Sequence, residues 1–252
     1  MKEQPVQHPD RLAGVWRFAR DLPLAVLLAL FILASVVLTW NHPPVTTALL
    51  TIALALQAFY RPTPGDRMVM VVAAILGTAG EIAEVRLGEW TYYAPDLVMG
   101  VPMWIALIWA NLFALFGRLA RSWSALLDLW PGTGTVGRAR VRLLLAIPVI
   151  TQWVAALLLM EKMPLVWGLY LLMILIMALC WRTEKDLLLF LTGAVLGALG
   201  EFISIQLGYW SYCNPLFTEY GVDITLPLDW GLSAVIIHRV AGFLDRRRRK
   251  RG

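Results

Sequence analysis

Eight stretches of the chain are apolar over lengths close to those that cross a membrane, and no other feature constrains the fold as strongly. A spanning helix needs roughly 17–25 predominantly apolar residues. The eight candidates are approximately Leu22–Trp40, Val45–Tyr60, Met68–Leu87, Pro102–Gly117, Leu143–Met160, Pro164–Trp181, Leu187–Leu207 and Leu226–Phe243. The second, fourth and sixth are short and bounded by proline, so their ends are the least sharply defined. The sequence therefore predicts an all-α, polytopic membrane bundle of about eight transmembrane helices.

The composition excludes several other classes of protein. Of the 252 residues, 59% are hydrophobic and 15% are charged, whereas soluble domains usually have about 45–50% apolar and about 25% charged residues. A disordered chain, a soluble nucleic-acid-binding protein and a disulfide-stapled secreted module are all excluded. The first apolar stretch is too long for a cleavable signal, and Trp40-Asn41-His42-Pro43 is not a small-residue cleavage site.

The positive charges predict the orientation of the bundle. An eight-helix path puts both termini on one side, and 20 of the 22 Lys and Arg residues then fall on that side; only Arg86 and Lys162 lie at or near the other face. The positive-inside rule makes both termini cytoplasmic, in the cell (inner) membrane. The net charge of +5 thus reflects topology and not a nucleic-acid partner. The tail Arg246–Arg251 is either a solvated anchor or also touches anionic lipid head groups.

The cysteines and histidines do not indicate a disulfide, a metal site or a cofactor. Cys180 and Cys213 are expected on opposite sides of the bilayer, so they cannot form a bridge with each other. None of the three histidines has a partner at ligand spacing. The sequence has no phosphate-binding glycine loop, nucleophile elbow or Cys-x-x-Cys motif.

The chain contains an internal duplication. Residues 77–95 align without gaps on residues 197–215, at a shift of 120, and both copies contain Gly-x-x-Gly-Glu followed by Gly-x-Trp-(Thr/Ser)-Tyr and Pro. At the same shift Asp66 aligns with Asp186. We expect two four-helix repeats, residues 1–120 and 143–245, with a cytoplasmic linker at 121–142 and a basic tail at 246–252. Repeats with an even number of spans have the same orientation, so equivalent residues would face each other across a central interface.

Each predicted repeat places a glutamate inside an apolar helix. Glu81 and Glu201 precede the external glycine by seven residues, which puts them about 10 Å below the helix end at 1.5 Å per residue. Glu84 shares a face with Glu81, and its counterpart in the second copy is Ser204. Because an intramembrane charge is costly unless it is paired or faces a polar cavity, such acids indicate a functional site. The alternative is a structural role, in which they pair with Arg86 or with a neighbouring helix.

Aromatic residues accompany these acids in both copies. An aromatic belt at the membrane interface is their default role, but the repeated Trp-x-Tyr spacing close to the acids indicates the rim of a pocket. Pro102 and Pro227 are expected to open the next helices, and the glycines before each glutamate to let helices approach closely. The predicted catalytic residues are Glu81, Glu84, Glu201 and Asp229, and the predicted substrate-binding residues are Trp90, Tyr92, Trp104, Asn111, Trp210, Tyr212 and Trp230.

One family has a similar repeat unit. The matching residues are Glu81, Gly88, Trp90, Tyr92, Gly100 and Pro102 in the first copy, and Glu201, Gly208, Trp210, Tyr212, Gly221, Pro227 and Asp229 in the second. In this pattern the chain resembles the lycopene cyclase domain and the related membrane carotenoid hydratases. Where that family usually has paired glutamates after the proline, this chain has Met103-Trp104 and Leu228-Asp229. The resemblance implies a tandem membrane unit that acts on an isoprenoid or carotenoid-like lipid.

The buried acids and aromatic rings would suit acid-initiated alkene chemistry. Desolvation disfavours the carboxylate anion, a protonated acid can protonate an alkene, and aromatic faces stabilise the resulting carbocation. Two other functions also fit: a proton-coupled transporter of a small molecule or lipid that uses Glu81 and Glu201, and a membrane scaffold without catalysis. The expected partners are membrane lipids or a hydrophobic small molecule, with no cofactor and no nucleic acid. The oligomeric state stays open.

Overall fold

The structure is a computed structural model that describes residues 9–63, 65–127, 184–213, 221–222 and 226–250. This part of the chain is almost wholly helical. Its helices are α1 (Pro9–Thr39), α2 (Pro43–Phe59), α3 (Asp66–Leu87), α4 (Ile105–Leu127), α7 (Glu184–Gln206) and α8 (Leu226–Arg249). Its strands are β1 (Trp90–Tyr92), β2 (Leu97–Val98), β3 (Val101–Pro102) and β4 (Trp210–Tyr212).

Four of the described helices are long and apolar enough to cross a membrane. The spanning segments are Asp21–Thr39, Asp66–Leu87, Ile105–Ser124 and Lys185–Gln206, and α2 is a shorter apolar helix. The chain is therefore an all-helical, multi-pass membrane protein, as the sequence predicts. The predicted fifth and sixth spans, and Cys180 with them, lie outside the described residues. The count of eight spans and the two-repeat organisation stay predictions.

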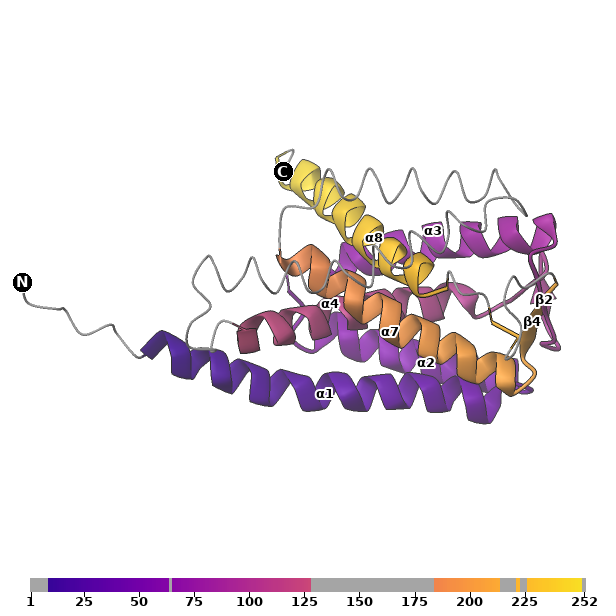
Figure 1. Ribbon diagram of the computed structural model, residues 1–252, viewed down its shortest axis with the longest axis horizontal. Helices are drawn as coiled ribbons and strands as arrows, with labels where there is room; N and C mark the ends of the chain where they lie inside the picture. Colours follow the sequence, from indigo (N-terminus) through magenta and orange to yellow (C-terminus); the bar gives the residue numbers. More distant parts are fainter. Residues whose placement is uncertain (1–8, 64, 128–183, 214–220, 223–225, 251–252) are drawn as a thin grey trace, which may run out of the picture.

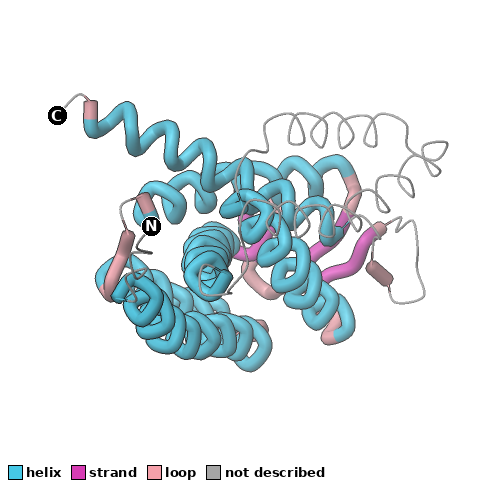
Figure 2. Tube along the Cα trace, turned by 60° about the vertical axis from the view of Figure 1, so that its left-hand side comes forward, coloured by secondary structure: helices cyan, strands magenta, loops and turns pink. Residues whose placement is uncertain are grey.

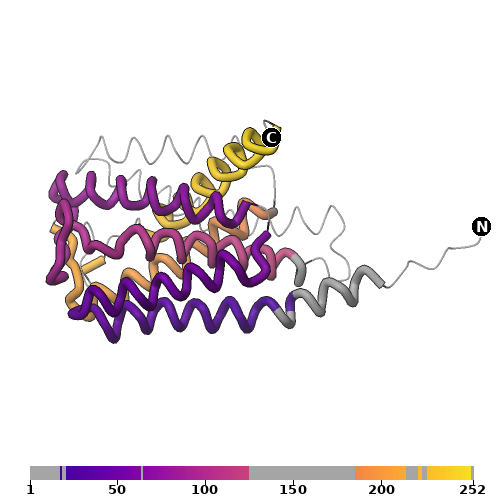
Figure 3. The backbone as a smooth tube through the Cα atoms, turned by 180° about the vertical axis from the view of Figure 1, so that it is seen from behind, coloured from indigo at the N-terminus to yellow at the C-terminus, as the bar shows by residue number. Residues whose placement is uncertain are grey.

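The helices run side by side, and the strands gather at one end of them (Figures 1 and 2). Helix α4 contacts each of the other described helices, so it occupies the centre of the bundle. The start of α1 lies toward the end opposite the strands (Figure 1), and the view from behind shows the end of α8 toward that same end (Figure 3). The basic residues in the first turns of α1 and the last turn of α8 thus lie away from the strands.

Two glycines end the glutamate-bearing helices in the same way. Gly88 follows α3 with φ of +78°, and its N–H donates to the carbonyls of Glu84 and Val85. Gly208 follows α7 with φ of +74°, and its N–H donates to the carbonyl of Ile205. Glycine adopts this left-handed conformation without a steric cost, and in that conformation it ends the helix and turns the chain. Each helix is therefore followed directly by a strand, β1 after α3 and β4 after α7.

Strands β1 and β4 pair antiparallel, although about half of the chain separates them. The register places Trp90 opposite Tyr212 and Tyr92 opposite Trp210. The strand that follows α3 is thereby joined to the strand that follows α7. This small sheet fixes the outer ends of the two helices relative to each other.

The prediction that Pro102 opens a helix is wrong. Residues Leu97–Pro102 instead form a β2–β3 hairpin, in which Val98 pairs with Val101. Its two loop residues, Met99 and Gly100, have φ of +57° and +90°, as a tight two-residue hairpin turn requires. Because Pro102 lies in a short edge strand, its missing N–H costs nothing there, and α4 begins only at Ile105. The equivalent prediction for Pro227 is correct, since it lies in the first turn of α8.

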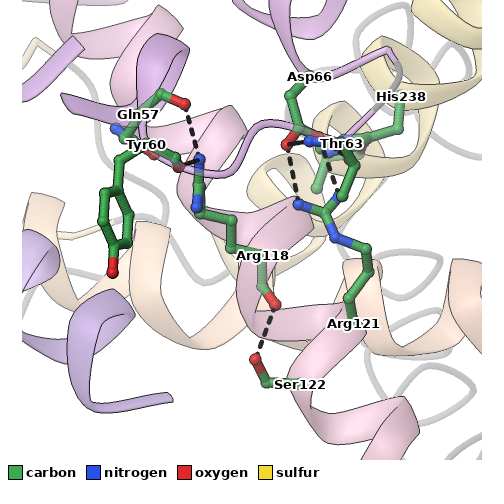
Figure 4. A network of polar contacts seen from close by, with 9 residues as sticks. Gln57, Tyr60, Thr63, Asp66, Arg118, Arg121, Ser122 and His238 are labelled. Carbon is green, nitrogen blue, oxygen red and sulfur yellow. Dashed lines mark hydrogen bonds and ion pairs between the residues drawn. The ribbon is translucent and has the colours of Figure 1, made fainter. Parts of the chain in front are cut away.

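At the opposite end of the bundle, two aspartates tie neighbouring helices together. Asp66, the first residue of α3, is buried and accepts hydrogen bonds from both terminal nitrogens of Arg121 on α4, at 3.0 and 3.1 Å (Figure 4). Thr63 donates to the same carboxylate through its backbone N–H and its hydroxyl. Asp186 on α7 similarly binds Arg239 on α8, at 2.9 Å. The aligned aspartates therefore make equivalent contacts. Helix α4 continues as far as Leu127, into the predicted linker.

Candidate functional site

A cavity of about 470 Å³ lies among α1, α3, α4, α7 and α8. Most of its lining is aliphatic or aromatic, and its polar groups are few. The predicted residues that line it are Glu81, Glu84, Glu201, Asp229, Trp90, Tyr92, Trp104, Trp210, Tyr212 and Trp230. The structure thus brings all four predicted acids and six of the seven predicted binding residues to one cavity. Ligand pockets typically measure about 300–1,000 Å³ and are mostly apolar with a few placed polar groups.

Asn111 is the predicted residue that lies away from this lining. Its amide nitrogen donates to the carbonyls of Leu50 and Leu107, both at 2.9 Å, and its amide oxygen accepts from Gln57 at 2.8 Å. These bonds join α2 to α4. The amide nitrogen and oxygen of Asn111 are therefore both used in hydrogen bonds that hold α2 and α4 together. Asn111 stabilises the packing of these helices and does not line the cavity.

Glu81 is fixed by two donors from separate elements. The Tyr92 hydroxyl, on β1, donates to Glu81 Oε2 at 2.6 Å, and the indole nitrogen of Trp109, on α4, donates to Glu81 Oε1 at 3.1 Å. Glu81 is only 8% exposed. Burial raises the pKa of the Tyr92 hydroxyl well above its usual range. Tyr92 therefore keeps its proton and acts as a donor at any physiological pH.

Glu201 has the same two kinds of donor. The Tyr212 hydroxyl, on β4, donates to Glu201 Oε1 at 2.5 Å, and the indole nitrogen of Trp230, on α8, donates to Glu201 Oε2 at 2.6 Å. The rings of Trp109 and Trp230 stack on each other, with centroids 5.2 Å apart and an interplanar angle of 13°. The two glutamates thus belong to one connected arrangement in which a pair of stacked indoles lies between them.

Four glycines on the glutamate helices play two different parts. A Cβ on Gly77 would lie 2.0 Å from the Trp109 ring, and a Cβ on Gly197 would lie 2.2 Å from the Trp230 ring. By contrast, a Cβ on Gly80 or Gly200 would meet no atom within 4 Å. The first pair makes room for the stacked indoles. The second pair lines the cavity and leaves it open beside each glutamate.

Trp109 is the residue of this site that the sequence analysis missed. It lies 28 residues after Glu81, and Trp230 lies 29 residues after Glu201. This near-equal spacing could have identified Trp109 as the counterpart of Trp230 in the first copy. Alignment of Pro102 with Pro227 hides it, because that alignment adds five residues to the second copy.

The remaining two acids differ from the matched pair. Glu84 lines the cavity, is partly buried, and its carboxyl makes no hydrogen bond or ion pair with any residue that the structure describes. No ion pair joins Arg86 to Glu81 or to Glu84 within the described ranges. The pairing with Arg86 that the sequence allows is therefore not formed. Asp229 reaches the same cavity from the first turn of α8.

Aromatic rings close the end of the cavity nearest the strands. Trp104 is 2% exposed and packs edge-on against Trp40, which stacks on Tyr209 at a centroid distance of 4.2 Å. Trp90 and Tyr212, which are paired across β1 and β4, also contact each other edge-on. Trp40 and Trp104 are buried, and the other three rings are half-buried. In the described part of the chain, no group of three or more His, Cys, Asp or Glu side chains could hold a metal ion.

Comparison with known proteins leaves the family of this chain open. No family model matches it, and no curated protein matches it. Two solved structures are similar: a cross-linked MvINS trimer, at 17% identity, and MvINS, a mycobacterial Insig homolog from Mycobacterium vanbaalenii, at 18% identity. Each gives a TM-score of 0.46 and covers 73% of this chain and 95% of the other. A similarity of this size establishes neither a shared fold nor a shared function.

Proposed function

We propose that the protein binds an isoprenoid or carotenoid-like lipid in its cavity and catalyses acid-initiated alkene chemistry, of the cyclase or hydratase type. The observation that carries this proposal is the pair of buried glutamates, each fixed by a tyrosine and a tryptophan, on either side of stacked indoles. The resemblance of the repeat unit to the lycopene cyclase domain supports the same chemistry.

The substrate class follows from the lining of the cavity. Aliphatic side chains from α1, α3, α4, α7 and α8 are the largest class of lining residue, followed by aromatic ones. Helices α3 and α7 each have the length and apolarity of a membrane span. A hydrocarbon chain is taken up from the bilayer into such a site without loss of apolar contacts, whereas a polar metabolite would lose its hydration. An unsaturated lipid is therefore the fitting ligand.

The reaction begins when a carboxylic acid protonates an alkene. A new C–H bond forms from the π electrons, and the adjacent carbon becomes positively charged. Glu81 and Glu201 accept hydrogen bonds on both oxygens, so the protein holds both carboxyl groups in place. Together with the faces of Trp109 and Trp230, they stabilise that positive charge. Loss of a proton from a neighbouring carbon gives an isomerised or cyclised product, and capture by water gives an alcohol.

We also propose that the chain is a tandem repeat in the cell inner membrane, with both termini on the cytoplasmic side. Three matched features support the repeat: the two glutamate sites, the two glycine-ended helices, and the ion pair that each aligned aspartate, Asp66 and Asp186, makes with an arginine of the following described helix. The charge distribution supports the orientation. In this arrangement, β1 and β4 lie at the external end of the cavity.

Cysteine labelling tests this orientation. Cys213 follows β4 and is exposed, so we expect a membrane-impermeant maleimide to modify it in intact cells of a Cys180→Ser strain. A Lys250→Cys substitution, in a chain that also carries Cys180→Ser and Cys213→Ser, should react only after the cells are opened. Labelling of Lys250→Cys but not of Cys213 in intact cells would reverse the assignment.

Lipid analysis of a deletion strain tests the function. We expect the deletion strain to accumulate an isoprenoid lipid that the wild-type gene converts, as seen by mass spectrometry of extracted lipids. A chain with both Glu81→Gln and Glu201→Gln, expressed at the normal level, should convert it roughly 10²–10⁴-fold more slowly. Glu89→Gln is the matched control, because Glu89 lies outside the cavity lining. An unchanged lipid profile in the double variant would refute the proposal.

A proton-coupled transporter would use the same pair of acids, and the test separates it from an enzyme. Transporter sites commonly lie at interruptions in membrane helices, whereas α3 and α7 are continuous. If the deletion changes no lipid but uptake into vesicles depends on Glu81 and Glu201, transport replaces catalysis as the function. If neither lipids nor uptake change, a scaffold is the remaining function.

A further inference from the structure

The acids that line the cavity are matched between its two sides only in Glu81 and Glu201; Glu84 and Asp229 have no acidic counterpart. Glu84 on α3 and its aligned residue, Ser204 on α7, both line the cavity. The Ser204 hydroxyl donates to the carbonyl of Gly200 in its own helix at 2.9 Å. Its proton is therefore used within the helix, so of these two aligned positions only the one on α3 supplies an acid. Asp229, on α8, is the other acid outside the matched pair.

Glu84 also differs from the two paired glutamates in its contacts. Both carboxyl oxygens of Glu81 and of Glu201 accept hydrogen bonds from tyrosine and tryptophan. The Glu84 carboxyl, as described above, has no such partner among the described residues. A general acid must come within hydrogen-bond reach of the atom that it protonates. A carboxyl group that is hydrogen-bonded to the protein through both oxygens is poorly placed to reach a substrate atom. A carboxyl group on the cavity wall without such bonds is well placed to reach it.

We infer that Glu84 is the proton donor, and that it protonates the substrate from the α3 side of the cavity. This inference rests on the proposed function. The O–H bond of Glu84 breaks, its proton forms a C–H bond with one alkene carbon, and the positive charge stays on the other carbon, near the stacked indoles. A neighbouring C–H bond then returns a proton to the Glu84 carboxylate, and its electron pair forms the new alkene. The acid is regenerated, and no further reactant enters.

One-sided proton delivery has a consequence for the product. A substrate with two equivalent ends, bound across the two halves of the cavity, meets the donor at one end only. A single passage through the site therefore modifies one end. The paired residues contribute to charge stabilisation on both sides, but they do not make the reaction symmetric.

The test uses the purified full-length protein in lipid vesicles, with the lipid extract of the deletion strain as substrate and D₂O as solvent. The O–H proton of Glu84 exchanges with solvent deuterium between turnovers, so the wild-type product should gain one deuterium at each converted end. Glu84→Gln should lower conversion by roughly 10²-fold or more, without lowering the melting temperature, because no described contact of Glu84 is lost. Glu89→Gln is again the matched control. A Glu84→Ser/Ser204→Glu chain, which moves the acid to α7, should recover part of the conversion.

The outcomes separate this inference from the proposed function. If the Glu81→Gln/Glu201→Gln chain is inactive while Glu84→Gln converts lipid at the wild-type rate, Glu84 is not the donor and the proposed function survives. Loss of conversion and deuterium uptake in Asp229→Asn, with Glu84→Gln active, assigns the donor to Asp229 and overturns the inference. If no variant changes the lipids, the proposed function itself fails. A lowered melting temperature of Glu84→Gln would indicate a structural role instead.

Discussion

Gly77→Ala and Gly197→Ala will each destabilise the protein by about 1–3 kcal/mol or more. The added Cβ would stand 2.0 Å from the Trp109 ring in the first case and 2.2 Å from the Trp230 ring in the second, far inside van der Waals contact. The Trp109 ring cannot simply move aside, because it stacks on Phe113 as well as on Trp230. Any shift large enough to relieve the clash also moves the indole nitrogen away from its glutamate. The loss should therefore include packing and a buried hydrogen bond.

The matched controls are Gly80→Ala and Gly200→Ala, on the same two helices. A Cβ there meets nothing within 4 Å, and alanine is the better helix former by about 1 kcal/mol, so these two variants should be neutral or slightly stabilised. The measurement is the free energy of unfolding in detergent, with tryptophan fluorescence to follow the indole pair. If all four variants unfold alike, the close packing of glycine against indole is not what holds the helices in place.

The sequence predicts the parts of this site that repeat at a constant spacing. Glu81 with Glu201 and Tyr92 with Tyr212 are visible because both copies keep the same distance between acid and aromatic residue. That spacing is set by the end of the helix at Gly88 or Gly208 and by a three-residue strand. Because local backbone geometry sets this spacing, the spacing can be recognised in the sequence alone.

The rest depends on contacts between segments, which no local pattern records. Trp109 comes after the β2–β3 hairpin, which belongs to the first copy, so an alignment anchored on Pro102 passes over it. Asn111 has the same polarity as a binding residue, and only its neighbours on α2 and α4 reveal that it holds those helices together. The antiparallel pairing of β1 with β4 is equally invisible, because a three-residue strand has too few residues to specify its partner.

Tyr92→Phe will destabilise the protein by about 1–3 kcal/mol, the range for leaving a buried hydrogen-bonding group unsatisfied. The substitution removes a single oxygen and leaves Glu81 Oε2 without its donor. Because Tyr92 is 6% exposed and Glu81 is 8% exposed, water cannot easily replace the lost hydroxyl. Under the proposed function, lipid conversion should fall as well, since one of the two contacts that hold Glu81 is gone.

The neighbouring tyrosine supplies the control. Tyr93 is 57% exposed, and its hydroxyl bonds to Ser211 at 2.7 Å on the surface. Tyr93→Phe makes the same chemical change one residue away, yet it should alter stability by no more than about 0.5 kcal/mol. Equal losses in Tyr92→Phe and Tyr93→Phe would contradict a special role for the buried hydroxyl.

The double variant Tyr92→Phe/Tyr212→Phe then tests whether the two glutamates form one unit. Each tyrosine holds its own glutamate. Those glutamates are linked through the stacked rings of Trp109 and Trp230, and the tyrosines through the pairing of β1 with β4. If the stacked pair transmits a shift from one side to the other, the two losses will differ from their sum by about 0.5 kcal/mol or more. Strict additivity in unfolding experiments would mean two independent acid sites that happen to share a cavity. A measurable coupling would mean a single site, in which a change at one glutamate alters the contribution of the other to stability.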